Sequence, residues 1–516
     1  MNGILLIIFA IIFCFLYRNR IMKYLKDRWE FVTTINQIPG IDIWSLLKEF
    51  LKTTLDSKEF TYQLEALFRK YAYRHDHGMI RVWLGFTPFI IMTRSKSAKF
   101  ILESTSLIDK PKEYDVFKRL VGDGMLSSSG QTWFKARRML TPAFHFNILN
   151  KYIEVFNEQS KVLIGELEKH CGTNETFDIL PYLRRYGMDT IAGKEIFIFT
   201  KTAMGVSIHA QANHNQDYYH SLRKALNLMW AKIRYPWFWF PPVRWIYGFD
   251  RKLDYYCNRC KDLTREIIAL KKKDWEAYDH QPSFEELSTS GRKKLDFMDL
   301  LFSIRDEYGL TDEDIRGQVD MFMAAGSDAV TAQIGFNLFA LGHRQHFQDK
   351  VYHELKDVLG ETERDITTDD LSHLKYLYQV ICETGRYTPN VVMIGRQVTE
   401  DIEICGYKIP KGAVCALSPF AIMRDPQHYE NPEVFNPAHF DPEKVMNRDP
   451  FAFIPFSAGI RNCIGHRFAI LEMQITIAAI LRKYRVISML PEEENRAIPE
   501  FSLKPSRGFP VRLEGR

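Results

Sequence analysis

The alternation of apolar and polar positions predicts long helices through much of the chain. The clearest runs from about Asp312 to Leu341, where Thr311 can cap the N-terminus and acidic residues fill the first turn. The middle of this helix is apolar on most faces, in the run MFMAAGSDAVTAQIGFNLFAL, so we expect it to be buried. It nevertheless carries Asp328, and a buried carboxylate needs a partner or a function.

Weaker patterns complete the secondary structure. We predict a second helix over residues 370–387, which stops before Pro389, and a third over residues 465–484. Short β-rich stretches at 392–398 and 408–417 predict two small strands. Helices predominate, so the predicted fold class is mainly α with a small β region.

The N-terminus has an apolar pattern of its own. Residues 4–17 read ILLIIFAIIFCFLY and are followed by basic residues, and the run counted from Met1 approaches the ~17–25 residues of a membrane span. Basic residues after the run place the body on the cytosolic side. The alternative is a cleaved signal peptide, but no basic region precedes the run and no small-residue cleavage site follows it.

No later stretch has the composition of a domain linker, and no repeat of fixed period is present. We therefore predict a transmembrane signal-anchor over residues 1–17, a basic linker over 18–38 and one large domain over 39–516. The segment 193–200, GKEIFIFT, has the character of an insertion in that domain.

Composition narrows the class of protein. The formal net charge of +5 over 516 residues is too small to indicate a nucleic-acid partner. Eight scattered cysteines do not form a disulfide framework, which favours a reducing, cytosol-facing location.

One cysteine has distinctive neighbours, in the segment FIPFSAGIRNCIGHRFA. Gly459 and Gly465 allow close backbone approach, and the helix that begins behind Cys463 directs free N–H groups at the sulfur, which favours a thiolate. Such a thiolate can bind iron. Buried packing is the alternative for any single cysteine.

The segment F-S-A-G-I-R-N-C-I-G resembles the haem-binding loop F-x-x-G-x-R-x-C-x-G of the cytochrome P-450 superfamily. Other landmarks of that family precede this loop and occur in the expected order along the chain. They are Trp133 and Arg137 in W-x-x-x-R, Glu383 and Arg386 in E-x-x-R, Arg396 in a following strand, and His439 where a P-x-R-F loop usually has arginine. The resemblance extends from about Pro39 to Val511 and is strongest to the family 4 branch of lipid and fatty-acid hydroxylases.

The resemblance implies a P-450 fold and a role for each matched residue. Cys463 is the expected axial ligand of the iron of a haem b group. The haem-binding set is expected to comprise Trp133, Arg137, Arg396, Phe456, Arg461, Cys463 and Gly465. Gly326 is expected to leave room for oxygen and Asp328 to assist protonation, while Glu383, Arg386 and His439 are expected to form a structural network. Because histidine is shorter than arginine and only partly charged, we expect that network to be weakened.

Two positions depart from the family pattern. The oxygen-binding segment usually reads A/G-G-x-D-T-T, but Ala329 has no hydroxyl, and Thr331 lies about 200° further around the helix. Ser327 or an ordered water are the candidate replacements, and we expect imperfect proton delivery. Some family 4 members bind haem through a glutamate ester in this segment, whereas Ala325 has no carboxylate. The haem is therefore expected to be non-covalent apart from the thiolate–iron bond.

These expectations combine into a membrane-anchored monooxygenase of the endoplasmic reticulum that faces the cytosol. It would insert one oxygen atom from O2 into a C–H bond of an apolar substrate, with fatty acids or related lipids as the implied class. Electrons would come from NADPH through a separate reductase, with cytochrome b5 as a further candidate donor. Two alternatives stay open: a haem-thiolate isomerase or dehydratase acting on lipid peroxides, and a haem-binding paralogue with little activity.

Overall fold

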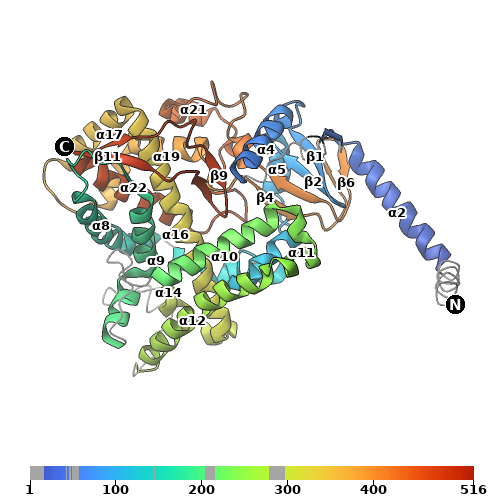
Figure 1. The fold of residues 1–516 in the computed structure, drawn as a ribbon, viewed down its shortest axis with the longest axis horizontal. Helices are drawn as coiled ribbons and strands as arrows, with labels where there is room; N and C mark the ends of the chain where they lie inside the picture. The colour runs from blue at the N-terminus through green and yellow to red at the C-terminus, as the bar shows by residue number, and fades with distance from the viewer. Residues whose placement is uncertain are drawn as a thin grey trace.

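A computed structural model describes residues 17–41, 44–45, 48, 57–144, 146–203, 216–277 and 297–516. The predicted anchor over residues 1–17 lies outside these residues except for Tyr17. Among the helices within the described ranges, none combines the length and apolarity needed to cross a bilayer. The segment 18–38, expected as a linker, is largely helical and projects from the body at one end of the molecule (Figure 1).

Helices make up most of the described chain (Figure 1). The α-helices are α2 (Arg18–Asn36), α4 (Ser57–Ala72), α5 (Ser95–Leu102), α6 (Lys118–Val121), α7 (Gly130–Leu140), α8 (Phe146–Glu168), α9 (Leu180–Ala203), α10 (Gln216–Arg234), α11 (Pro241–Ile246), α12 (Phe249–Glu276), α14 (Phe297–Ser303), α15 (Arg305–Tyr308), α16 (Asp312–His343), α17 (Gln345–Leu359), α18 (Thr368–His373), α19 (Lys375–Tyr387), α20 (Pro419–Ile422), α21 (Pro442–Met446) and α22 (His466–Lys483). Short 3-10 turns are η1 (Lys112–Val116), η2 (Thr141–Phe144), η3 (Pro236–Trp239), η4 (Pro437–Phe440) and η5 (Pro450–Ala452). The segment 193–200 lies within α9.

Strands form small sheets beside the helices. They are β1 (Met79–Leu84), β2 (Thr87–Met92), β3 (Phe177–Asp178), β4 (Ile394–Gln397), β5 (Ile402–Ile404), β6 (Tyr407–Ile409), β7 (Val414–Leu417), β8 (Tyr484–Ser488), β9 (Ala497–Pro499), β10 (Leu503–Pro505) and β11 (Pro510–Gly515). The largest sheet has the order β1-β2-β7-β4, in which only the β2–β7 pair is parallel. A second sheet has the order β3-β11-β8, and β5–β6 and β9–β10 are separate pairs.

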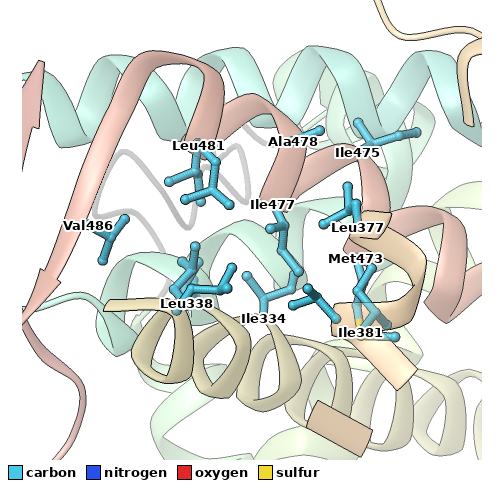
Figure 2. Packing of buried hydrophobic residues seen from close by; sticks show 14 of the residues in the cluster. Ile334, Leu338, Leu377, Ile381, Met473, Ile475, Ile477, Ala478, Leu481 and Val486 are labelled. Atoms are coloured by element: carbon cyan, nitrogen blue, oxygen red, sulfur yellow. The ribbon is translucent and has the colours of Figure 1, made fainter. Parts of the chain in front are cut away.

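The main core lies where α16, α19 and α22 meet, with β8 at its edge (Figure 2). Ile334 and Leu338 of α16 face Ile477 of α22, and all three are fully buried. The predicted helix over 312–341 is confirmed as α16. It begins with a capping box in which the Thr311 side chain and the Asp314 carboxylate each accept the other's backbone N–H.

Two predicted elements are divided in the structure. The helix expected over 370–387 is interrupted at Leu374, because the Glu354 carboxylate accepts the backbone N–H groups of Tyr376 and Leu377 and starts a new helix there. The strand expected over 408–417 is two strands, because Pro410 and Gly412, with φ of +97°, turn the chain between them.

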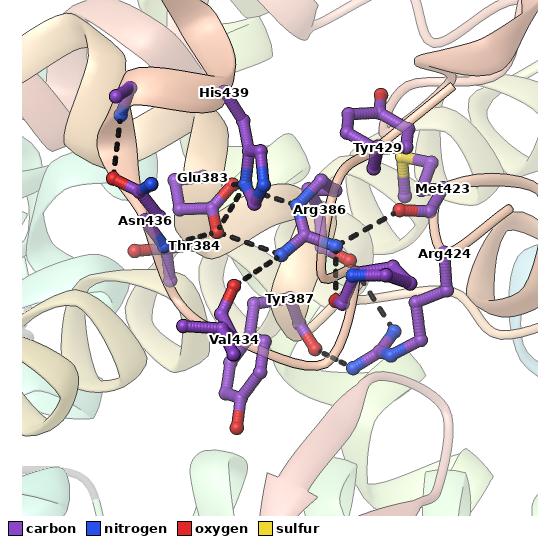
Figure 3. Close-up of polar contacts among 12 residues, drawn as sticks. Glu383, Thr384, Arg386, Tyr387, Met423, Arg424, Tyr429, Val434, Asn436 and His439 are labelled. Carbon is purple, nitrogen blue, oxygen red and sulfur yellow. Dashed lines mark hydrogen bonds and ion pairs between the residues drawn. The ribbon is translucent and has the colours of Figure 1, made fainter. Parts of the chain in front are cut away.

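A buried ion pair connects α19 to the segment that precedes the cysteine loop (Figure 3). Arg386 and Glu383 are fully buried and form two hydrogen bonds, each 2.7 Å long. The remaining guanidinium donors go to the backbone oxygens of Met423, Pro432 and Val434. The pair is therefore satisfied by both partners and also holds residues 423–434 against the helix.

His439 completes this network. Its Nδ1 lies 3.2 Å from both Glu383 oxygens, and its Nε2 lies 2.7 Å from the backbone oxygen of Glu430. Both ring nitrogens thus face acceptors, so His439 connects the Glu383 carboxylate to the backbone of residue 430. The structure brings the three predicted network residues together.

The network predicts acid-sensitive stability. Burial raises the pKa of Glu383, but hydrogen bonds from Arg386 and His439 outweigh burial, so the pKa is lowered overall. The stabilisation is therefore fully present above the unfolded-state pKa of about 4.3 and is lost as pH falls through the folded value. Glu383→Gln should lower stability by about 3–5 kcal/mol near neutral pH. In thermal denaturation, its difference from the parent protein should shrink as the buffer approaches that acidic range.

Glu361→Gln is the matched control, since Glu361 pairs with Lys356 at the surface and its side chain is 79% exposed. That change should alter stability by at most about 1 kcal/mol. Equal losses from the two variants, or a Glu383→Gln deficit that does not vary with pH, would contradict the interpretation.

Candidate functional site

One cavity of about 1370 Å³ brings the cysteine loop and α16 to a common space. Cys463 and Arg461 line it from the loop, and Ala325, Gly326 and Ala329 line it from the helix. Most of the other lining side chains are apolar, among them Phe117, Leu126, Phe144, Phe297 and Phe322. The predicted ligand Cys463 and the predicted oxygen-site residue Gly326 thus share one apolar space.

The cysteine loop is held by its own backbone and by close packing against α5. The Cys463 N–H donates to the Phe456 carbonyl at 2.9 Å. Gly459 has φ of +69°, and a Cβ at this position would lie 1.8 Å from the Leu102 carbonyl oxygen. Both conditions require glycine here. Gly465 is the N-cap of α22, as the sequence predicted.

The Cys463 side chain is exposed to the cavity. Burial raises the pKa of its thiol, while the Gly465 backbone N–H and the positive charge of Arg137 act in the opposite direction. The N–H group at the start of α22 therefore favours the thiolate, as expected from the sequence, but burial outweighs it and the pKa of the thiol is raised overall. A bound metal ion would overcome this effect, because metal binding deprotonates a coordinating thiol.

The positively charged side chains of Lys110 and Arg461 line the cavity, and that of Arg396 lies near enough to act on both. Arg396 is 97% buried in β4, Arg461 stands two residues before Cys463, and Lys110 lines the cavity before η1. Lys110 also lies over the Tyr114 ring, with its Nζ 4.2 Å from the ring centroid. These cations come from three separate segments of the chain.

Their charges are poorly compensated by the protein. Burial, together with the charges of Arg396 and Arg461, lowers the pKa of Lys110 well below its usual value. Burial and the charge of Arg396 lower the pKa of Arg461 to about 9, and its Nε has no hydrogen-bond partner among the described residues. Burial also lowers the pKa of Arg396. A ligand that brings two carboxylates, as the propionates of haem do, therefore fits this cluster.

Trp133 and Arg137 lie on α7 beside the cysteine loop. Trp133 is buried, and the Arg461 guanidinium carbon lies 4.7 Å from its ring centroid. Arg137 donates to the backbone oxygen of Asn462 at 2.8 Å and to the Asn462 side-chain oxygen at 2.6 Å. Both residues line the cavity, and Arg137 also braces the loop that carries Cys463.

The α16 wall differs in detail from the expectation. A Cβ added to Gly326 would lie 2.5 Å from Cδ1 of Ile191 in α9, so this glycine allows α9 and α16 to approach closely. Whether it also leaves room for oxygen stays a prediction. Ala325 and Ala329 line the cavity, so neither a carboxylate nor a hydroxyl reaches it from these two positions.

Asp328 does not line the cavity; its carboxylate is bound by the C-terminal hairpin. Ser502 Oγ donates to Oδ2 of Asp328, and Lys504 Nζ lies 3.2 Å from Oδ1. The candidate replacement Ser327 donates its hydroxyl to the Met323 carbonyl at 2.6 Å, within its own helix. Thr331 likewise donates to the Ser327 carbonyl at 2.7 Å.

Several cavity residues could not be selected from the sequence. Lys110 is one of 69 Lys and Arg residues and stands in no motif. Asn390 and Ser502 also line the cavity; Asn390 lies between α19 and β4, and Ser502 lies between β9 and β10. Only tertiary contacts bring them to α16, so no local signal could have identified them.

Comparison with known proteins places this site in a family. The sequence model of the cytochrome P450 family matches residues 39–511. Human (Homo sapiens) cytochrome P450 4V2 is 35% identical over 503 residues, covering 96% of this chain and 93% of the relative. Cytochrome P450 4c3 of Drosophila melanogaster is 32% identical over 518 residues, covering 96% and 92%.

The crystal structure of the cytochrome P450DA heme domain superposes with a TM-score of 0.73 at 21% identity, covering 88% of this chain and 94% of that one, which supports the fold. The extent of the resemblance seen in the sequence, from Pro39 to Val511, is confirmed. Haem with cysteine-thiolate ligation is the cofactor of this family and fits the cavity described above. The chain therefore belongs to the cytochrome P450 family, in its family 4 branch, and is a haem-thiolate monooxygenase.

Proposed function

We propose that this protein hydroxylates fatty acids or related lipids at a membrane, with Cys463 as the haem iron ligand. The observation that carries the proposal is the apolar cavity that joins Cys463 to α16. Its volume of about 1370 Å³ exceeds the ~300–1,000 Å³ of common ligand pockets, which leaves room for an apolar substrate beside the haem. The haem, when bound, supplies the oxygen-activating chemistry.

The protein's own residues bind the haem and the substrate, orient them, and keep water out of the cavity. The haem propionates would be held by Lys110, Arg396 and Arg461. The position of Cys463 is fixed by its N–H bond to the Phe456 carbonyl and by the Arg137 bond to the backbone of Asn462. The apolar lining binds the alkyl part of a substrate and keeps water away from it. Electrons come from NADPH through a separate reductase, with cytochrome b5 as a second donor, in line with the family to which the chain belongs.

The reaction is tested by reconstituting the full chain with NADPH, its reductase and a panel of fatty acids and lipids under ¹⁸O2. The expected outcome is a hydroxylated lipid that carries one labelled oxygen, identified by mass. The alternative of a peroxide isomerase or dehydratase is kept open by Ala329, which removes the usual hydroxyl. Turnover of a lipid hydroperoxide without NADPH, and no labelled product with it, would favour that alternative and overturn the proposal.

Haem retention tests the role of Lys110. Lys110→Met removes a charge-assisted bond to a propionate, which contributes about 1.5–3 kcal/mol, so the affinity for haem should fall by roughly 10- to 100-fold. The haem-free protein should become more stable, because a buried cation that is repelled by Arg396 and Arg461 is gone. Both are measurable, by haem transfer to apomyoglobin and by thermal denaturation of the haem-free protein.

Lys112→Met is the control, since Lys112 is exposed two residues further along the chain. It should change neither quantity. If Lys110→Met leaves haem transfer as slow as in the parent protein, Lys110 does not hold the haem.

We also propose that η3 and α11 contact the bilayer. Their aromatic segment divides into two faces: Phe238 packs on Phe249 at 4.7 Å, whereas Phe240 is 63% exposed, Trp245 82% and Ile246 71%. Exposed tryptophan and phenylalanine beside aliphatic residues suit the boundary between lipid and water. Such a contact accords with an anchor over residues 1–17 and with location at the endoplasmic reticulum membrane.

Bromolipid quenching tests this contact in the full chain. In vesicles of brominated phosphatidylcholine, Trp245→Phe should reduce the fraction of tryptophan emission that is quenched, because an indole in contact with the bromine atoms is lost. Trp275→Phe is the control, since Trp275 is only 6% exposed and lies in the core beside Phe302. Equal quenched fractions for the parent and Trp245→Phe would place this face away from the bilayer.

A further inference from the structure

The α16 segment that faces the cavity carries an acid but offers no hydroxyl there. Ala329 has none, and the hydroxyls of Ser327 and Thr331 are both bound to carbonyls of their own helix. A proton that passes from Asp328 to the cavity through a protein hydroxyl therefore needs one from another element.

The β9–β10 hairpin provides such a group. Ser502, in the turn between the two strands, is 99% buried, lines the cavity and donates its hydroxyl to the Asp328 carboxylate. The same residue thus contacts the acid and lines the cavity. The contact joins residues 174 positions apart in the sequence.

The position of this turn is tied to Ala329. The Asn390 side chain donates to the Ala329 carbonyl at 2.9 Å, and the Asn390 carbonyl accepts the Leu503 backbone N–H at 2.8 Å. One residue thus connects the helix, at the place where the hydroxyl is missing, to the residue next to Ser502. The hairpin is held where Ser502 can act in place of residue 329.

A path of ionisable groups leads from Asp328 towards solvent. Lys504 Nζ lies 3.2 Å from Asp328 Oδ1 and 3.0 Å from Glu500 Oε2. The side chains of Asp328 and Lys504 are 11% and 6% exposed, whereas that of Glu500 is 29% exposed. Glu500 is thus the member of this group that water reaches.

On the basis of the function proposed above, we propose that Ser502 supplies the proton-passing hydroxyl that α16 lacks, and that Glu500, Lys504 and Asp328 reload it. Lys504 first gives a proton to the Asp328 carboxylate, which frees the Ser502 hydroxyl to turn towards the cavity. Ser502 Oγ then gives its proton to an acceptor in the cavity and takes one from Asp328 Oδ2. Lys504 is reprotonated by Glu500, which takes a proton from the bulk solvent. One proton enters at Glu500 and one leaves at Ser502, so no charge is left behind and no further reactant is needed.

The test compares Ser502→Ala and Ser502→Thr in the full-length holoenzyme with its reductase. A positioned acid–base group contributes roughly 10²–10⁴-fold, so Ser502→Ala should lower product formed per NADPH consumed by about tenfold or more, with a matching rise in released peroxide. Ser502→Thr, which keeps a hydroxyl, should retain the parent ratio. Ala329→Thr added to the Ser502→Ala protein should restore much of the product formed per NADPH consumed, because α16 then provides a hydroxyl at residue 329.

Ser506→Ala is the matched control, since Ser506 lies in the same hairpin and its hydroxyl contacts Asn495 instead of Asp328. It should leave the ratio unchanged. Unchanged coupling in Ser502→Ala would overturn the inference, and so would an equal loss in Ser506→Ala, because the effect would then belong to the hairpin as a whole.

Infrared spectroscopy of the resting protein gives a readout that does not depend on turnover. Ser502→Ala removes a hydrogen bond to a carboxylate, so a carboxylate stretching band should shift, and that shift should be absent when the same change is made in an Asp328→Asn protein. Absence of the shift in the first comparison overturns this inference by itself. If the parent forms no labelled lipid, the proposed function fails, and the infrared result still decides whether Ser502 and Asp328 are joined.

Discussion

The Glu383–Arg386 ion pair is the interaction on which the geometry around the cysteine depends. The other N–H groups of the Arg386 guanidinium donate to the carbonyls of residues 423, 432 and 434. Glu383 also accepts the Asn436 backbone N–H at 2.7 Å. A segment with little regular structure is thereby fixed on α19, and it leads through η4, α21 and η5 to the loop of Cys463. Removing either partner would leave a buried charge without compensation, so the pair tolerates little change.

The cation cluster shows a different kind of dependence. The charge of Arg396 lowers the pKa of both Lys110 and Arg461, the charge of Arg461 also lowers that of Lys110, and the protein provides few counter-charges there. Asp109, which acts on Arg461, is already bound by the Gly130 N–H at 2.8 Å. Repulsion between these cations destabilises the cofactor-free protein. An anionic cofactor would relieve that repulsion on binding, and this relief would contribute to its affinity.

Local patterns predicted the elements that are defined by local interactions. The capping residue Thr311 and the apolar run behind it determine α16, and the glycines around Cys463 determine the loop. The break at Leu374 has no local signal, because its cause is Glu354 on another helix, whereas Pro410 and Gly412 mark the turn between β6 and β7 in the sequence itself. In the site, residues in short motifs could be predicted. Lys110, Asn390 and Ser502 could not, because they reach the cavity through contacts between distant segments.

The β9–β10 hairpin both lines the cavity and binds the Asp328 carboxylate. Phe501 and Leu503 flank Ser502 and line the cavity, and the Phe501 ring packs on Phe117 with 5.5 Å between centroids. A substrate that presses on these side chains presses on the turn that holds the Asp328 carboxylate. Selection for a new substrate at this wall would therefore also change how efficiently reducing equivalents are used, so the two traits would evolve together.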